Sequence, residues 1–355
     1  MESVKKTVSK YKCNTPFPST RQRTVRREQP VNRSIRRRTI SAKDTDRTCM
    51  DITRKTWQIY SCSPLYHFDS DKSSLKRYSR LLSATLTAHG RRGMGISTDE
   101  QETGTKAVFT VAMGLAVLSD EPDAIKLTIN TNEGKSVAEF YFCSVEAEPV
   151  IKDMAEIPVK RKGRKQRLAD QFTTLPLFLC KGNLTTRKHV FNWLKTEFDC
   201  NIRKIEFSCL SLTWMLAMWA NISLKQKKSK STKISWKIPV PDIGINTIET
   251  SFTAESISKL WTNVHPSGSD LISVEEVENF IGGIEDHLTQ HFKIKFQMLP
   301  ITSLNLEIGL FHNEGKIKVL SMRHVHTVLT HLSCLAIEQL DWTQYSTSSD
   351  TTPTT

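Results

Sequence analysis

Acidic residues are almost absent from the N-terminal end of this chain. The first forty-three residues contain thirteen lysines and arginines but only two acids, Glu2 and Glu28, which gives a formal charge of +11. The remaining 312 residues carry 37 basic and 35 acidic side chains, so most of the net charge of +13 belongs to this arm. A basic arm on a nearly neutral body is typical of a protein that binds a polyanion, either nucleic acid or anionic lipid. An enzyme that acts on a small acid in a cleft would carry its charge in the body instead.

Apolar residues are also scarce in the arm. The stretch Lys5–Arg47 has almost no aromatic and few aliphatic side chains, so it cannot bury enough apolar surface to offset the entropy lost on ordering. We therefore expect residues 1–50 to be disordered, together with a Ser/Thr-rich tail at 343–355. Residues 51–342 between them are long enough for one large domain or for two subdomains with a break near 150–172.

Paired cysteines and a spanning apolar segment are missing. None of the eight cysteines forms a CxxC pair and no signal peptide opens the chain, so we expect free thiols in a reducing compartment. The run Phe207–Leu224 is free of charge, but its Ser, Thr and Asn side chains make it too polar for a lone membrane span. It predicts a buried core helix.

Signatures of catalysis and metal binding are weak. Residues Glu133–Ser136 end like a phosphate-binding loop, but Ile129 stands where that loop requires a glycine. His287 and His291 are four residues apart, yet Leu288 occupies the position at which zinc proteases place a glutamate. No serine or cysteine lies in a nucleophile-elbow context. We therefore expect a protein that is not an enzyme and has no cofactor and no metal site.

Hydrophobic periodicity and turn residues predict short elements that occur in runs. Helices are expected at 75–88, 185–198, 207–224, 253–264, 274–288 and 325–336. Strands are expected at 106–112, 124–129, 137–145, 175–179, 234–238, 248–252, 293–298, 304–311 and 316–320. Runs of antiparallel strands with helices between the runs favour an α+β fold, with mixed, mostly antiparallel sheets flanked by helices.

Helix boundaries are also indicated by the sequence. Ser73 or Ser74 can cap the first of these helices, and Gly90 lies just past its expected end. Ser273 and Glu276 have the spacing of a capping box at the start of the helix that follows them.

Two basic runs in the body are stronger functional signals. One contains Lys160, Arg161, Lys162, Arg164, Lys165 and Arg167, and the other contains Lys225, Lys227, Lys228, Lys230 and Lys233. The first run has the composition of a nuclear import signal or of a nucleic-acid contact, and the two roles can coexist. The second is either a solvated loop or a DNA contact. Neither run contains interleaved aromatics, so binding would follow the phosphate backbone and depend strongly on salt.

Seven segments together resemble the centromere protein L family, whose members are subunits of the constitutive inner kinetochore. In chain order they are WQIYSCSPLYHF at 57–68, LKRYSRLL at 75–82, TLPLFL at 174–179, FDC at 198–200, LTWMLAMW at 212–219, HFKI at 291–294 and GKIKVL at 315–320. They span about residues 55 to 340, the whole part of the chain that we expect to fold. None of them is a catalytic motif.

The resemblance implies a non-enzymatic nuclear protein of the centromere and kinetochore that supports chromosome segregation. Members of the family pair with centromere protein N through their C-terminal part. The heterodimer joins other inner kinetochore subunits on nucleosomes that contain the centromeric histone H3 variant, and its basic groove accommodates DNA. The run at 160–167 is more basic than we expect of the family, so the hypothesis that it binds DNA rests on its charge alone.

For the partner interface we consider the last strand and the last helix. The strand offers Lys316, Ile317, Lys318, Val319 and Leu320 as an edge for pairing between subunits, and the helix offers an apolar face with Val325, Val328 and Leu332. The alternative is that both elements are simply core, because an amphipathic helix does not reveal which surface covers it.

Two other functional classes remain open. A basic-armed DNA-binding or repair factor outside the kinetochore would fit the arm, but as an enzyme it would need a cluster of metal-binding carboxylates, and the acids here are scattered. A membrane-surface protein could use the arm as a polybasic anchor. The sequence has no lipidation motif, since Glu2 follows Met1 and the chain ends in Thr355.

Overall fold

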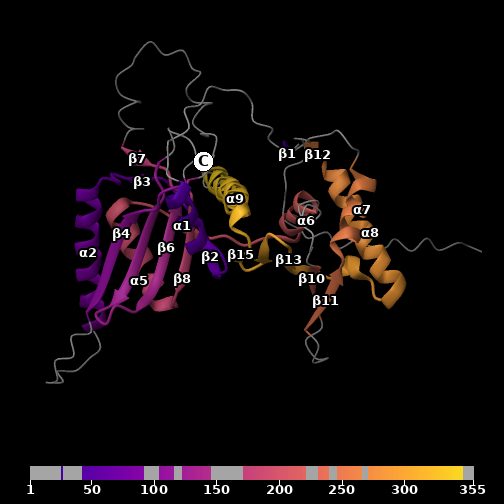
Figure 1. Cartoon of the computed structure of the whole chain (residues 1–355), viewed down its shortest axis with the longest axis horizontal. Helices are drawn as coiled ribbons and strands as arrows, with labels where there is room; N and C mark the ends of the chain where they lie inside the picture. Colours follow the sequence, from indigo (N-terminus) through magenta and orange to yellow (C-terminus); the bar gives the residue numbers. More distant parts are fainter. Residues whose placement is uncertain are drawn as a thin grey trace, which may run out of the picture. The chain divides into compact units, whose positions relative to one another are not determined.

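The computed structural model describes residues 25–26, 42–91, 104–115, 122–144, 171–220, 231–239, 246–265 and 271–346. They belong to two compact units that alternate along the chain, and Figure 1 labels their elements. Unit 1 comprises residues 1–32 and 207–313, and unit 2 comprises residues 33–206 and 314–355. Most of the break that we expected near 150–172 lies outside the described residues, which resume at residue 171.

Unit 2 is built on an antiparallel sheet with the strand order β15-β2-β8-β6-β5-β4. The strands are β2 (Trp57–Cys62), β4 (Thr105–Val111), β5 (Ile125–Thr131), β6 (Ser136–Cys143), β8 (Leu177–Gly182) and β15 (Lys316–Val319). Three short strands complete the unit: β9 (Ile202–Lys204) pairs with β2, and β3 (Leu65–Tyr66) pairs with β7 (Phe172–Thr173). The predicted turn between β5 and β6 is present, and Gly134 adopts a φ of 78° in it.

Helices cover both faces of this sheet. Alternate residues of β5, Ile125, Leu127 and Ile129, are fully buried in a core that also contains the apolar faces of α2 (Lys72–Arg91) and α5 (Leu184–Phe198). The opposite face of the sheet packs against α1 (Ala42–Ile52) and α9 (Val325–Ser346), which follows the 3-10 turn η4 (Met322–His324). Unit 2 is therefore a sheet between two helical layers (Figure 1).

Unit 1 has a smaller antiparallel sheet with the order β11-β10-β13-β14. Its strands are β10 (Thr232–Lys237), β11 (Thr247–Phe252), β13 (Ile301–Asn305) and β14 (Gly309–His312). Its helices are α6 (Cys209–Trp219), α7 (Ala254–Val264), α8 (Val274–Phe292) and the 3-10 turn η3 (Phe296–Met298). A two-residue pair joins β1 (Val25–Arg26) of the basic arm to β12 (Leu271–Ile272).

Several predicted boundaries are confirmed. Ser273 and Glu276 form the expected capping box at the start of α8, and Thr253 caps α7 by accepting the N–H of Ser256 at 3.1 Å. The charge-free helix α6 is buried as expected, with Leu212, Met215 and Leu216 fully inaccessible. None of the helices in the described residues is long and apolar enough to cross a membrane.

The N-terminal cap of α2 differs from the prediction. Asp71, rather than Ser73 or Ser74, caps the helix, because its carboxylate accepts the backbone N–H of Ser73 at 2.9 Å and of Ser74 at 3.2 Å. A carboxylate at this position also interacts favourably with the positive end of the helix dipole. The helix continues to Arg91, so Gly90 lies within it rather than beyond it.

Two of the strand predictions near the end of unit 1 were wrong. Residues 293–298 form no strand: Lys293 ends α8 in a left-handed conformation (φ 57°), and the 3-10 turn η3 follows. Residues 304–311 are two strands, because Leu306 and Gly309 exchange backbone hydrogen bonds that close a tight turn. Leu306 and Ile308 are buried in this turn, so the apolar pattern runs through it without a break.

The α+β fold class is confirmed, with mostly antiparallel sheets flanked by helices. The ends of the folded part differ from the prediction. The helix α1 begins at Ala42, inside the segment 1–50 that we expected to be disordered, and α9 continues to Ser346. Apart from β1, residues 1–41 lie outside the described residues, as do residues 347–355.

Candidate functional site

Ten of the eleven lysines and arginines in the two basic runs lie outside the described residues. Lys160, Arg161, Lys162, Arg164, Lys165 and Arg167 fall between β6 and β7, and Lys225, Lys227, Lys228 and Lys230 fall between α6 and β10. Lys233, at the end of the second run, is the described member. It lies on β10 and forms an ion pair of 2.6 Å with Glu249 on β11.

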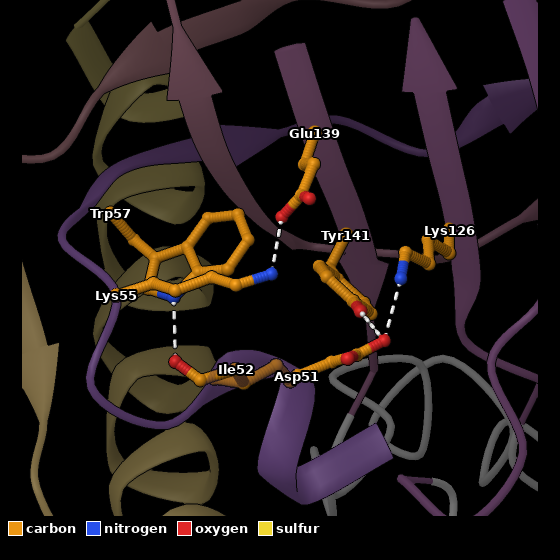
Figure 2. A network of polar contacts seen from close by, with 7 residues as sticks. All are labelled: Asp51, Ile52, Lys55, Trp57, Lys126, Glu139 and Tyr141. Carbon is orange, nitrogen blue, oxygen red and sulfur yellow. Dashed lines mark hydrogen bonds and ion pairs between the residues drawn. The ribbon is translucent and has the colours of Figure 1, made fainter. Parts of the chain in front are cut away.

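The C-terminal end of the basic arm is attached to unit 2 through α1. Figure 2 shows the polar contacts that hold this helix against the sheet. Asp51 on α1 forms an ion pair of 2.6 Å with Lys126 on β5 and accepts a hydrogen bond of 3.4 Å from the hydroxyl of Tyr141 on β6. The indole N–H of Trp57 donates to the carbonyl of Ile52 at 2.9 Å, so β2 also fixes the end of the helix.

Aromatic rings and a second ion pair surround this network. The rings of Trp57 and Tyr141 meet edge to face with their centroids 5.5 Å apart. Lys55, just beyond α1, forms an ion pair of 2.8 Å with Glu139, while Lys126 lies 5.4 Å from the centre of the Tyr141 ring. Cations held near an aromatic face gain additional electrostatic attraction. The point at which the arm joins unit 2 is therefore fixed by several mutually supporting contacts (Figure 2).

The network changes the proton affinity of its acids. Burial alone would raise the pKa of Asp51, but the hydrogen bond and charge of Lys126 outweigh it, and the pKa lies below its ordinary value. Burial raises the pKa of Tyr141, and the negative charge of Asp51 adds to this effect. At neutral pH the network therefore holds an ionised Asp51 beside a neutral Tyr141, which is the arrangement that its hydrogen bond requires.

A cationic stripe lies on the outer face of α2. Lys72, Lys76, Arg77 and Arg80 are all exposed, and the helix contains no aspartate or glutamate from its first residue to its last. Residues spaced by four lie on one side of a helix, so Lys72, Lys76 and Arg80 follow each other along a line of about 12 Å. Charges arranged in this way match the phosphates along a nucleic-acid backbone.

The neighbouring helix α5 also carries exposed cations. On α5, Lys188 and Lys195 are exposed, and Arg187 lies 5.6 Å from the centre of the Tyr60 ring. The acids of this region, such as Glu197, are fewer than the cations. The hydrophobic pattern of the sequence assigned no role to the cations of α2. The signal that could have singled them out is the lack of acids along the whole helix.

The predicted interface residues are mostly buried within unit 2. The strand β15 pairs with β2, with Lys316 opposite Gln58 and Ile317 opposite Trp57. Lys316 is exposed, and Lys318 and Leu320 are half-buried. The remaining five residues are 0 or 1 % exposed: Ile317, Val319, Val325, Val328 and Leu332. These five side chains form core in this chain, which was the alternative interpretation of the sequence.

The histidines do not assemble a metal site in the described part of the chain. The rings of His287 and His291 meet edge to face on α8 with centroids 4.4 Å apart. Within the described ranges, no group of three or more His, Cys, Asp or Glu side chains could hold a metal ion. An open depression of about 300 Å³ along α7 is lined by Glu255, Ser258, Lys259, Thr262 and Asn263.

Comparison with known proteins identifies the family. The model of the family "Centromere protein L" matches residues 51–337. Centromere protein L of Homo sapiens is 28% identical over 298 residues, which cover 82% of this chain and 81% of the human protein. The protein of the same name from Gallus gallus is 29% identical over 81% of this chain and 80% of its own, and that from Xenopus tropicalis is 26% identical over 93% of both. The match covers most of both units, and the chain belongs to the centromere protein L family.

Proposed function

We propose that this chain is a non-enzymatic subunit of the inner kinetochore that pairs with centromere protein N, binds centromeric chromatin and supports kinetochore assembly and chromosome segregation. Membership of a structural centromere protein family carries the proposal, because the match runs from residue 51 to residue 337. A centromeric role also places the chain in the nucleus, on the chromosome. The partners are then centromere protein N, other inner kinetochore subunits, and the centromeric nucleosome with its DNA.

The charge distribution supports contact with DNA. The arm carries a formal charge of +11 on residues 1–43, and unit 2 holds the end of this arm through the α1 network. A tethered cationic arm stays near a bound duplex and can follow its phosphates without reading the bases. We include the two basic runs at 160–167 and 225–230 and the cationic stripe of α2 in the same proposal. Each adds positive charge that can contact phosphates without reading the bases.

For the pairing with centromere protein N we propose the surface around β15 and α9. Lys316, Lys318 and Leu320 are the members of the predicted set that solvent reaches. The buried residues of the set, such as Val319, would shape this surface from beneath, since a side chain without exposed area makes no direct contact with a second protein. This division separates surface variants, which should affect pairing, from core variants, which should affect folding.

Co-expression with centromere protein N tests the proposal. The two chains should co-elute on gel filtration as a 1:1 species by light scattering. The double variant Lys318→Glu with Leu320→Ser should weaken this complex while the chain alone stays folded by circular dichroism. A matched control is Glu255→Lys with Lys259→Glu, which reverses an exposed ion pair of 2.7 Å on α7 of unit 1 and should leave the complex intact.

A stable, folded chain that does not associate with centromere protein N would overturn the pairing. If such a chain still bound duplex DNA through its arm, the result would support the other function that the sequence left open, a basic-armed DNA-binding or repair factor outside the kinetochore.

A further inference from the structure

Three large apolar side chains are exposed together at the end of α8 in unit 1. Phe292 is 59 %, Ile294 is 41 % and Met298 is 60 % exposed, and all lie within seven consecutive residues. For side chains of roughly 200 Å² each, these fractions correspond to about 300 Å² of apolar surface. Scattered single apolar residues on a surface need no explanation, but three within seven residues expose an apolar area of a size that is often functional. We call Phe292, Ile294 and Met298 the apolar patch.

The backbone holds the patch in a defined shape. Lys293 ends α8 in a left-handed conformation, and its N–H donates to the carbonyl of Thr289 at 3.0 Å. Phe296, between the exposed residues, is fully buried and meets Trp236 on β10 edge to face at 5.3 Å. The side-chain amide of Gln297 donates to Asp286 at 2.7 Å. Anchors at the start of the patch and within it therefore hold the backbone while these three side chains stay exposed.

The surroundings of the patch are positively charged. Lys293 and Lys295 are exposed and alternate with the apolar residues, while His287 and His291 are exposed on the last turns of α8. The sequence from His287 to Leu306 contains no acid. Of the two acids just before it, Asp286 is exposed and Glu285 is half-buried. Asp286 is bonded to Gln297, and burial, with a smaller contribution from Asp286, raises the pKa of Glu285 to about 7.

The apolar patch and the lysines between its residues together favour one class of ligand. A fixed apolar surface requires bulky apolar groups, which a nucleic-acid backbone does not offer, and the alternating lysines favour carboxylates between those groups. We propose that the apolar patch is a docking site for a short acidic segment of another protein, in which aliphatic or aromatic side chains alternate with Asp or Glu. The small area implies a weak and reversible contact, typical of a peptide motif rather than of a permanent subunit interface.

A selection experiment tests this proposal with the full-length chain. A library of random peptides displayed on phage is selected on the wild-type protein and, in parallel, on the triple variant Phe292→Ser, Ile294→Ser and Met298→Ser. The exposed positions should tolerate these changes, and circular dichroism and thermal unfolding check that they do. We expect the wild-type protein to enrich acidic peptides with bulky apolar residues. Affinity for the triple variant should be lower by roughly tenfold or more.

Charge reversal provides the second arm of the test. The variant Lys293→Glu with Lys295→Glu should reduce the affinity for the selected peptides, and the reduction should shrink at high salt. Three results would overturn the proposal: no peptide enriched over the triple variant, enriched peptides without acids, or equal affinity for wild type and charge-reversed protein. Light scattering shows whether the patch instead joins two copies of this chain. A duplex-binding assay with the triple variant shows whether it contacts DNA, and either of these results would also replace the proposal.

Discussion

Asp51 on α1 and Lys126 on β5 form an ion pair of 2.6 Å, at the point where the basic arm meets unit 2. Both side chains are partly exposed, at 42 % and 24 %, and the hydroxyl of Tyr141 supports the same carboxylate. The relationship matters for function because α1 is the structured continuation of the arm. If the arm binds a polyanion, this ion pair helps to hold the bound arm at a fixed place on unit 2.

Replacing Asp51 should loosen α1. We expect Asp51→Asn to lower the free energy of unfolding by about 1 kcal/mol or less, since a partly exposed ion pair contributes little. Hydrogen exchange in residues 42–52 should accelerate more than exchange in the sheet. The matched control is Glu255→Gln, which breaks an exposed ion pair with Lys259 on α7 and should change neither measurement.

The same pair predicts a dependence on pH. The pKa of Asp51 is lowered by its partners, so the ionised side chain stabilises the folded state above the ordinary pKa of 3.8, and this contribution disappears as the pH falls through the folded value. The stability difference between wild type and Asp51→Asn should therefore vanish in acid. A difference that persisted there would mean that the carboxylate of Asp51 does not stabilise the fold through its charge.

Glu285 should make stability depend on pH in the opposite direction to Asp51. Burial, with a smaller contribution from Asp286, raises its pKa to about 7, whereas the unfolded chain ionises near 4.5, so the folded state loses stability as the pH rises between these values. We expect Glu285→Gln to stabilise unit 1 above pH 7 by on the order of 1–2 kcal/mol, after allowing for partial exposure, and to have little effect near pH 4. Denaturant unfolding monitored at the two pH values measures the difference.

Two glycines with similar backbone angles should respond differently to alanine. Gly134 has a φ of 78° and an added Cβ would meet nothing within 4 Å, so Gly134→Ala should cost about 1 kcal/mol for the left-handed conformation alone. Gly315 has a φ of 72°, but a Cβ added there would overlap the carbonyl oxygen of Ile205. The backbone must then shift, and we expect Gly315→Ala to cost about 3 kcal/mol or more by urea denaturation. Equal effects of the two substitutions would show that the close approach to Ile205 relaxes easily.

A charge at Val319 should unfold unit 2. This side chain is 0 % exposed on β15, and burying an unpaired carboxylate is among the most destabilising substitutions, at about 4 kcal/mol or more. We expect Val319→Asp to be insoluble or to lose cooperative thermal unfolding. A soluble, cooperatively folded Val319→Asp that failed only to form the complex with centromere protein N would instead place this residue at the partner interface.

Neutralising the basic run at 160–167 should weaken binding to any duplex similarly. Replacing Lys160, Arg161, Lys162, Arg164, Lys165 and Arg167 with glutamine should flatten the plot of affinity against salt, by about 0.9 in logarithmic slope for each phosphate that the variant no longer neutralises. The corresponding variant of the α2 stripe, with Lys72, Lys76, Arg77 and Arg80 replaced by glutamine, is measured beside it. An unchanged slope in either variant would dismiss that group of cations as a DNA contact.

Structural features that depend only on residues close together in the sequence could be predicted from it. The capping box of Ser273 and Glu276, the apolar stripe of α2 and the turn before β6 are of this kind, and all are present. The strand expected at 293–298 is absent because two remote contacts decide this segment. Phe296 turns inward to pack against Trp236, and Gln297 bonds to Asp286. The alternation of apolar and polar residues at 293–298 is equally compatible with a strand and with the observed helix end and 3-10 turn, so the sequence alone does not distinguish them.

The same distinction between local sequence and distant contacts applies to the candidate sites. The sequence by itself determined the charge of the arm, the α+β class and the family, because composition and ordered short segments carry that information. Only the tertiary structure decided which apolar surfaces are covered. It buries Val319, Val325 and Leu332 in unit 2 and leaves Phe292, Ile294 and Met298 exposed in unit 1, although both groups are equally apolar. The physical reason is that burial depends on which distant element packs over a side chain, and no local pattern contains that element.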